Sequence, residues 1–162
     1  MKKHITLLLI MFAFAMISCG GGEKSSTVQN PTTTKPTKEV KSDVPASERI
    51  TLDNKGVGRI KNVALDPTID TEMAARGEKL FSTNCSACHK IDKRFIGPSP
   101  KGVTKRRSPE WIMNMILDPQ LMVEQDRCAK DLLVEFNGAA MANQNMTEEQ
   151  ARDILEYFRT LE

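Results

Sequence analysis

Five consecutive residues, Cys85-Ser86-Ala87-Cys88-His89, constrain this chain more than any other part of its sequence. Two thiols three positions apart, with a histidine directly after them, form the pattern by which a c-type haem is attached. The thiols add to the haem vinyl groups, and the histidine then lies under the porphyrin face, where its imidazole can bind iron. The motif therefore predicts one covalent haem c, held by Cys85 and Cys88 and ligated by His89.

Two other kinds of site use cysteine pairs, and the rest of the sequence favours neither. A dithiol redox motif also reads Cys-x-x-Cys, but it needs a βαβ context that the helical patterns of this chain lack. A structural zinc site needs four ligands. Outside the motif the domain contains only Cys128, and the other histidine, His4, lies in the N-terminal apolar region. Cys128 is expected to be a small buried hydrophobe, with a regulatory thiol as the alternative.

The second axial ligand of the iron is predicted to be a methionine. No other histidine lies in the domain, and a thioether is the usual partner of histidine in electron-carrying haems. The candidates are Met73, Met113, Met115, Met122, Met141 and Met146. Four of these fall at helical positions that core packing explains, whereas Met141 lies in a loop from which it could reach across the haem. Met146, next to the capping residue Thr147, is the alternative ligand, and a core plug is the alternative role for Met141.

The first 18 residues have the composition of an export signal. Lys2 and Lys3 precede an apolar stretch at positions 5–17, whose 13 residues suit a signal-peptide core and are too few to span a bilayer. The following Met16-Ile17-Ser18-Cys19-Gly20 resembles a bacterial lipobox, which implies that Cys19 becomes the acylated first residue. An ordinary signal peptide with an incidental cysteine is the alternative.

Residues 19–49 are predicted to be the acylated cysteine followed by a flexible, disordered tether. Positions 20–48 contain no aromatic residue and are rich in Gly, Ser, Thr, Pro, Lys and Glu, a composition too polar to offset its own ordering entropy. The chain is therefore expected to be exported and lipid-anchored in the bacterial cell envelope, with its domain in the periplasm or at the cell surface.

The remaining residues, 50–162, are predicted to form one all-α domain. Positions 50–70 are expected to be extended and to lie against it. About four helices follow: one capped by Thr71 that runs to Asn84, one from Ser108-Pro109 to Asp118-Pro119, one that ends at Asn137-Gly138, and one opened by the capping box at Thr147. The long loops at 90–107 and 138–146 need a bound group to pack against, and the haem is that group.

Several features outside the haem motif match a single family. Gly77 and Phe81 form a Gly-x-x-x-Phe motif in the first predicted helix, and Tyr157 supplies an aromatic residue in the last. A Gly-Pro pair, ending at Pro98, follows the haem motif, and Met141 precedes the last helix. On these residues, positions 50–161 resemble a class I mono-haem cytochrome c.

The resemblance implies a fold, a ligand set and a function. The class I fold packs its helices around one covalent haem, the carbonyl of Pro98 orients His89, and Met141 is the second axial ligand. The implied function is electron transfer, not enzymatic catalysis, with a respiratory reductase or oxidase as acceptor. Residues 97–158 are also similar to small cytochromes that accompany nitrous oxide reductases. Because Ala142 stands where the family usually has proline, a haem enzyme or gas-sensing domain with a labile distal ligand is the alternative.

The charges of the domain are unevenly distributed along the chain. Residues 79–107 contain eight basic residues and one acid, whereas residues 108–162 contain eleven acids and four basic residues. The basic stretch is predicted to steer a redox partner with an acidic docking surface toward the haem edge, with ordinary solvated charge as the alternative. No nucleic-acid partner is expected for an exported chain. Candidates for contact with the haem propionates are Lys105, Arg106, Arg107 and Trp111, although core packing explains Trp111 equally well.

Overall fold

A computed structural model of the chain describes residues 43–162. The predicted signal peptide, the predicted acylation at Cys19 and the tether up to residue 42 lie outside this range and stay predictions. Within it the chain is helical, with two isolated β-bridges and no strand, so the predicted all-α class is confirmed. No helix in this part of the chain is long and apolar enough to cross a bilayer.

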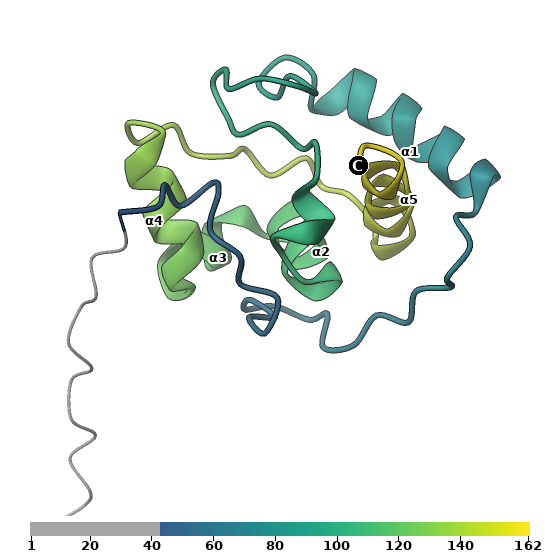
Figure 1. Ribbon diagram of the computed structural model, residues 1–162, viewed down its shortest axis with the longest axis horizontal. Coiled ribbons are helices and arrows are strands. Elements are labelled where there is room, and N and C mark those ends of the chain that lie inside the picture. The colour runs from purple at the N-terminus through teal and green to yellow at the C-terminus, as the bar shows by residue number, and fades with distance from the viewer. Residues whose placement is uncertain (1–42) are drawn as a thin grey trace, which may run out of the picture. The chain divides into compact units, whose positions relative to one another are not determined.

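Five α-helices and one short 3₁₀ helix make up the described fold (Figure 1). They are α1 (Thr71–Asn84), η1 (Val103–Lys105), α2 (Pro109–Leu117), α3 (Pro119–Gln125), α4 (Arg127–Glu135) and α5 (Glu148–Arg159). The sequence did not predict α3. Asp118 ends α2, and its side chain then accepts a hydrogen bond from the backbone N–H of Leu121, so the same residue caps α3. Pro119 thus opens a helix as well as stopping one.

The predicted helix ends are mostly correct. Ser108 caps α2, and the capping box at Thr147 is present at the start of α5. Asn137 and Gly138, with φ of 56° and 78°, end α4 in the left-handed region. The exception is α1, where the side chain of Asp70, one residue before the predicted cap, accepts the hydrogen bond from Met73 N–H.

Helices α1 and α5 pack directly against each other (Figure 1). Gly77 makes this close packing possible, because a Cβ atom there would lie 2.0 Å from the backbone oxygen of Asp153. Next to this contact the buried ring of Phe81 lies 5.7 Å from the ring of Tyr157 and 5.8 Å from that of Phe158, measured between centroids. The glycine and the aromatic residues therefore fix one helix pair, which forms one wall of the domain.

An extended segment at residues 45–65, which we call the strap, runs along α4 and α2 before the chain enters α1 (Figure 1). Ile60 is buried, in agreement with the predicted extended segment. The strap starts earlier than the sequence indicated. Ala46 is 2% exposed and Ser47 binds the carboxylate of Glu135, so residues 45–49 pack on the domain, although they were assigned to the tether.

Asn114, a buried residue of α2, holds the middle of the strap. Its side-chain amide donates to the carbonyls of Lys55 and Ile60, and its oxygen accepts from Ile60 N–H, at 3.1, 2.9 and 3.0 Å. Gly58 is required at this contact. A Cβ there would lie 2.3 Å from Asn114 Oδ1, and its φ of 153° disfavours other residues.

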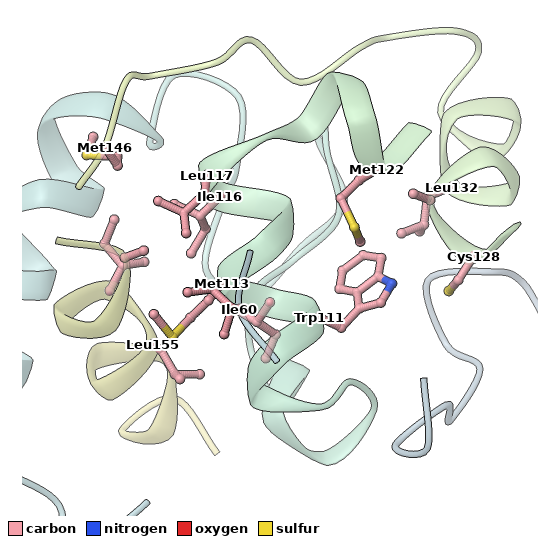
Figure 2. Packing of buried hydrophobic residues seen from close by; sticks show 14 of the residues in the cluster. Ile60, Trp111, Met113, Ile116, Leu117, Met122, Cys128, Leu132, Met146 and Leu155 are labelled. Carbon is pink, nitrogen blue, oxygen red and sulfur yellow. The ribbon is translucent and has the colours of Figure 1, made fainter. Parts of the chain in front are cut away.

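The hydrophobic core is built around α2 (Figure 2). The side chain of Met122 points at the ring of Trp111, and its sulfur accepts a hydrogen bond from Val57 N–H of the strap at 3.1 Å. Met146 lies at the other end of this core from Cys128. The core explains Met122, Met113 and Met146 without a further role, because all three are buried among apolar neighbours.

Candidate functional site

A mainly apolar cavity of about 240 Å³ lies inside the domain. Its walls come from α1, α2, α4 and α5 and from the two long loops, including the side chains of Phe81, Ile112, Leu132 and Ile154. Protein cores pack as tightly as organic crystals, with few voids larger than a water molecule. An apolar cavity of this size means that the fold is shaped around a bound group.

One wall of this cavity carries the cysteine and histidine motif. Cys85 caps the end of α1, where its N–H donates to Phe81 O at 2.9 Å. The chain then turns tightly, because the N–H groups of Cys88 and His89 both donate to Cys85 O, at 3.1 and 2.9 Å. All three motif side chains line the cavity. Burial raises the pKa of the Cys85 thiol, and the nearby Cys88 raises it further.

His89 is oriented by the loop that follows the motif. Its Nδ1 lies 2.8 Å from the carbonyl oxygen of Pro98, which fixes Nδ1 as the protonated nitrogen. The other ring nitrogen, Nε2, has no hydrogen-bond partner among the described residues. Gly97 leaves room for the ring, since a Cβ there would lie 2.5 Å from His89 Cε1. This is the tautomer and the free nitrogen that a metal-ligating imidazole needs.

Two methionines line the cavity, one of which the sequence predicted as a ligand. Met141 reaches it from the loop between α4 and α5, together with Ala140 and Ala142. Met115 lines it from α2, where the helical pattern had suggested core packing only. Met146, the alternative ligand, is buried in the core and does not line the cavity. The structure therefore brings Met141 to the same cavity as His89 and leaves Met146 outside it.

Two arginines bring positive charge to the cavity. Arg106 lines it, and burial, together with the neighbouring charge of Arg107, lowers the pKa of its guanidinium. Arg107 is 2% exposed, forms no ion pair with any acidic side chain of the described chain, and has a buried Nε without a hydrogen-bond partner. A buried cation in this state is unfavourable unless an anion approaches it. The carboxylates of haem propionates fit this requirement.

The other two candidates for propionate contact are placed differently. Lys105 does not line the cavity, and its ammonium pairs with the carboxylate of Glu162 at 2.8 Å. Trp111 does line it, but its indole N–H donates to Asp126 Oδ1 at 3.0 Å. Neither contact was visible in the sequence, because each joins residues that fold together from separate elements. Lys105 is a surface ion-pair residue, and Trp111 forms part of the wall.

The described residues offer no alternative metal site. No group of three or more histidine, cysteine, aspartate or glutamate side chains among them could hold a metal ion. Cys128 is buried on α4, away from the cavity lining, with its sulfur 4.0 Å from Thr51 Oγ1. Burial raises the pKa of this thiol, consistent with the expected role as a small buried hydrophobe.

Comparison with known families decides the identity of the domain. The family model for cytochrome c matches residues 74–162. This range includes the haem motif and every helix of the described structure, except that the first turn of α1 lies before it. The chain belongs to the cytochrome c family. Members of this family bind haem c covalently, so one haem c is the cofactor of this cytochrome c, and its attachment at Cys85 and Cys88, which line the cavity, stays a prediction.

Solved structures and curated relatives agree with this assignment. Cytochrome c from Rhodothermus marinus is 43% identical, with a TM-score of 0.63, over 72% of this chain and 93% of that one. Cytochrome c2 from Rhodopseudomonas palustris is 26% identical over 112 residues, 54% of this cytochrome c and 97% of the relative. A cytochrome c-553-like protein from Synechocystis is 42% identical over 48 residues, which span 46% of its own length.

Proposed function

We propose that this cytochrome c is a membrane-tethered electron carrier with His89 and Met141 as the axial ligands of its iron. The observation that carries the proposal is the cavity, which the haem motif, the loop of Met141 and the buried Arg107 all line. When bound, haem c supplies reversible one-electron chemistry at iron, between the ferrous and ferric states. A thioether on the distal side favours the ferrous state and so raises the reduction potential.

The protein contributes orientation and exclusion of water. The hydrogen bond from His89 Nδ1 to Pro98 O holds the imidazole in one orientation, which limits its movement when the charge of the site changes. Apolar side chains form most of the wall, among them residues of α2, α4 and α5, so few dipoles have to reorient with each electron. These properties suit an electron carrier, because small structural differences between its two oxidation states limit the reorganisation that accompanies each electron transfer.

A surface next to the cavity fits the docking of a redox partner. Phe95 and Ile96 are about half exposed, and Ile96 also lines the cavity. The ammonium of Lys90 lies 5.2 Å from the centre of the Phe95 ring. Lys93 and Lys101, in the same loop, are exposed and form no ion pair within the described chain. An apolar centre with basic neighbours supports an acidic docking surface on the partner.

The attachment to the membrane is proposed from the N-terminal sequence. The lipobox-like residues ending at Cys19 support acylation, and residues 20–42 supply the tether between that cysteine and the strap. The domain then works in the cell envelope, on the exported side of a membrane. The partner is proposed to be a respiratory reductase or oxidase, with nitrous oxide reductase as one candidate because of the sequence likeness described above.

A second candidate function is the binding of small ligands at the iron. Among the described residues, no hydrogen bond joins residues 140–146 to another element, whereas the loop after the haem motif is held by several. Met141 is therefore the proposed ligand that can dissociate from the iron more easily than His89. An engineered variant of the Rhodothermus marinus cytochrome c, 43% identical to this chain, has been solved with a carbene intermediate bound.

Carbon monoxide distinguishes the two functions. The purified, reduced full-length protein is mixed with carbon monoxide, and its Soret absorption is recorded before and after. An electron carrier with a firmly bound Met141 shows no change, and Met141→Ala shows the shift of a carbon monoxide complex. A shift in the wild type contradicts the carrier and supports the ligand-binding function.

A further inference from the structure

The strap is an addition to the part of the chain that matches the family. The family model starts at residue 74, and the strap occupies residues 45–65. Nevertheless it reaches the haem cavity, because Ser47 belongs to the lining. A segment outside the family match thus contributes to the site that defines the family.

The strap also holds the buried cation of this cavity. Two nitrogens of the Arg107 guanidinium donate to strap carbonyls, Nη2 to Ala46 O and Nη1 to Arg49 O. Nη1 also donates to Arg106 O at 3.0 Å, and the guanidinium carbon lies 5.2 Å from the centre of the Trp111 ring. Nε is left without a partner. The strap therefore fixes where this charge lies, although none of its carboxylates forms an ion pair with the guanidinium.

The two carbonyls are held in place by contacts that do not involve Arg107 side-chain atoms. Thr51 N–H donates to Arg106 O at 2.9 Å, which forms a short parallel bridge beside the arginine. Further along, Asn54 donates to Asp126 Oδ2 at 2.8 Å, and Asn114 holds the middle of the strap. Since the strap is anchored between the two carbonyls, where Ser47 binds Glu135, and again directly after them, it can impose a position on the guanidinium.

We propose that the strap is a positioning element, which holds the charge of Arg107 against the propionate edge of the haem and thereby raises the reduction potential. The inference rests on the proposed haem site. A fixed cation in a poorly solvated wall disfavours the ferric state, which carries one more positive charge than the ferrous state. If the strap releases the side chain, the guanidinium reaches solvent and its effect on the iron weakens. Ala46 and Arg49 act through their main-chain carbonyls and thus through Arg107.

A double-mutant cycle in the full-length protein tests the proposal. The three variants are deletion of residues 45–51, Arg107→Gln, and both changes together, and the measured quantity is the midpoint potential by spectroscopic redox titration. Each single change is expected to lower the potential, and the double change to lower it no further than Arg107→Gln alone. An unchanged potential after the deletion overturns the proposal. So does a deletion that lowers the potential equally in the Arg107→Gln background.

A matched control and a milder variant keep the test decisive. Arg59→Gln removes the same charge from an exposed strap side chain that pairs with Glu148, and it is expected to leave the potential unchanged. If the deletion prevents folding, Arg107→Lys replaces it, because an ammonium lacks the planar fork that binds both carbonyls. A lower reduction potential in Arg107→Lys supports the positioning role of the strap, and a potential equal to that of the wild type overturns this role. Covalent haem staining and the near-infrared spectrum of each protein show separately whether the proposed haem ligation itself has failed.

Discussion

The imidazole of His89 is held by a residue nine positions later in the chain, with 2.8 Å between its Nδ1 and the carbonyl oxygen of Pro98. The intervening loop is folded back on itself, because Gly97 N–H donates to Cys88 O at 2.9 Å and Lys101 N–H donates to Ile91 O at 3.2 Å. This side of the cavity is thus fixed by hydrogen bonds, and Gly97 leaves no room for a side chain beside the imidazole.

Substitution of Gly97 by alanine is expected to displace the imidazole. The new Cβ would lie 2.5 Å from His89 Cε1, so the ring has to move away from Pro98 and its hydrogen bond weakens. A less strongly hydrogen-bonded imidazole is a poorer donor to iron, so the reduction potential rises, and overpacking costs about 1–3 kcal/mol of stability. Redox titration and denaturant unfolding measure the two effects.

Gly138→Ala is the matched control for this prediction. A Cβ at this position meets no atom within 4 Å, although the φ of 78° makes the substitution strained. It is expected to cost about 1–2 kcal/mol without a change of potential. Equal potentials for Gly97→Ala and the wild type contradict the proposed role of this loop.

Substitution of Gly77 by alanine is expected to disrupt the packing of α1 against α5. In Gly77→Ala the new methyl group meets the backbone oxygen of Asp153 at 2.0 Å, and backbone cannot move aside as a side chain does. A loss of about 3 kcal/mol or more in the free energy of unfolding is expected. Ala75→Gly, an exposed change on the same helix, is the comparison, and its propensity cost is only about 1 kcal/mol. Similar losses in both variants contradict the proposed tight contact between α1 and α5.

The exposed lysines of the loop that contains Phe95 are expected to control reaction with charged partners. Lys93→Glu with Lys101→Glu should slow oxidation of the reduced protein by the anion hexacyanoferrate(III) and speed its oxidation by the cation tris(1,10-phenanthroline)cobalt(III). Both effects on the oxidation rate should be smaller at high salt, because charges are screened beyond about 8 Å at physiological ionic strength. Lys130→Glu, an exposed reversal on α4, is the control. Equal effects from Lys130→Glu mean that only net charge matters.

Membrane attachment is expected to depend on Cys19. In cells that export the protein, Cys19→Ser should move it from the membrane fraction to the soluble fraction, because the acylated residue is lost. Its absorption spectrum should stay unchanged, since residue 19 lies outside the haem domain. A variant that remains with the membranes contradicts the lipid anchor.

The features that sequence reasoning predicted correctly are local ones. The caps Ser108 and Thr147, the left-handed end at Asn137 and the all-α class each depend on residues within a few positions of one another. The haem motif is local for the same reason, since five adjacent residues carry its chemistry. A short sequence pattern is enough to identify such features.

The features that it missed depend on contacts between distant residues. The guanidinium of Arg107 meets the carbonyl of Ala46, 61 positions away, and nothing near either residue indicates this pairing. Lys105 was a candidate for propionate contact on charge alone, but it pairs with Glu162 at the end of the chain. Helical spacing alone also indicated only core packing for Met115, which lines the cavity.

The near-infrared spectrum of the oxidised protein tests the axial ligation most directly. Wild type, Met115→Ala and Met146→Ala are expected to show the weak absorption band of sulfur bound to ferric haem iron, and Met141→Ala is expected to lose it. If Met115→Ala loses the band and Met141→Ala keeps it, the sulfur ligand is Met115 on α2 and not Met141. Absence of the band from the wild type would contradict the proposed His89 and Met141 ligation altogether.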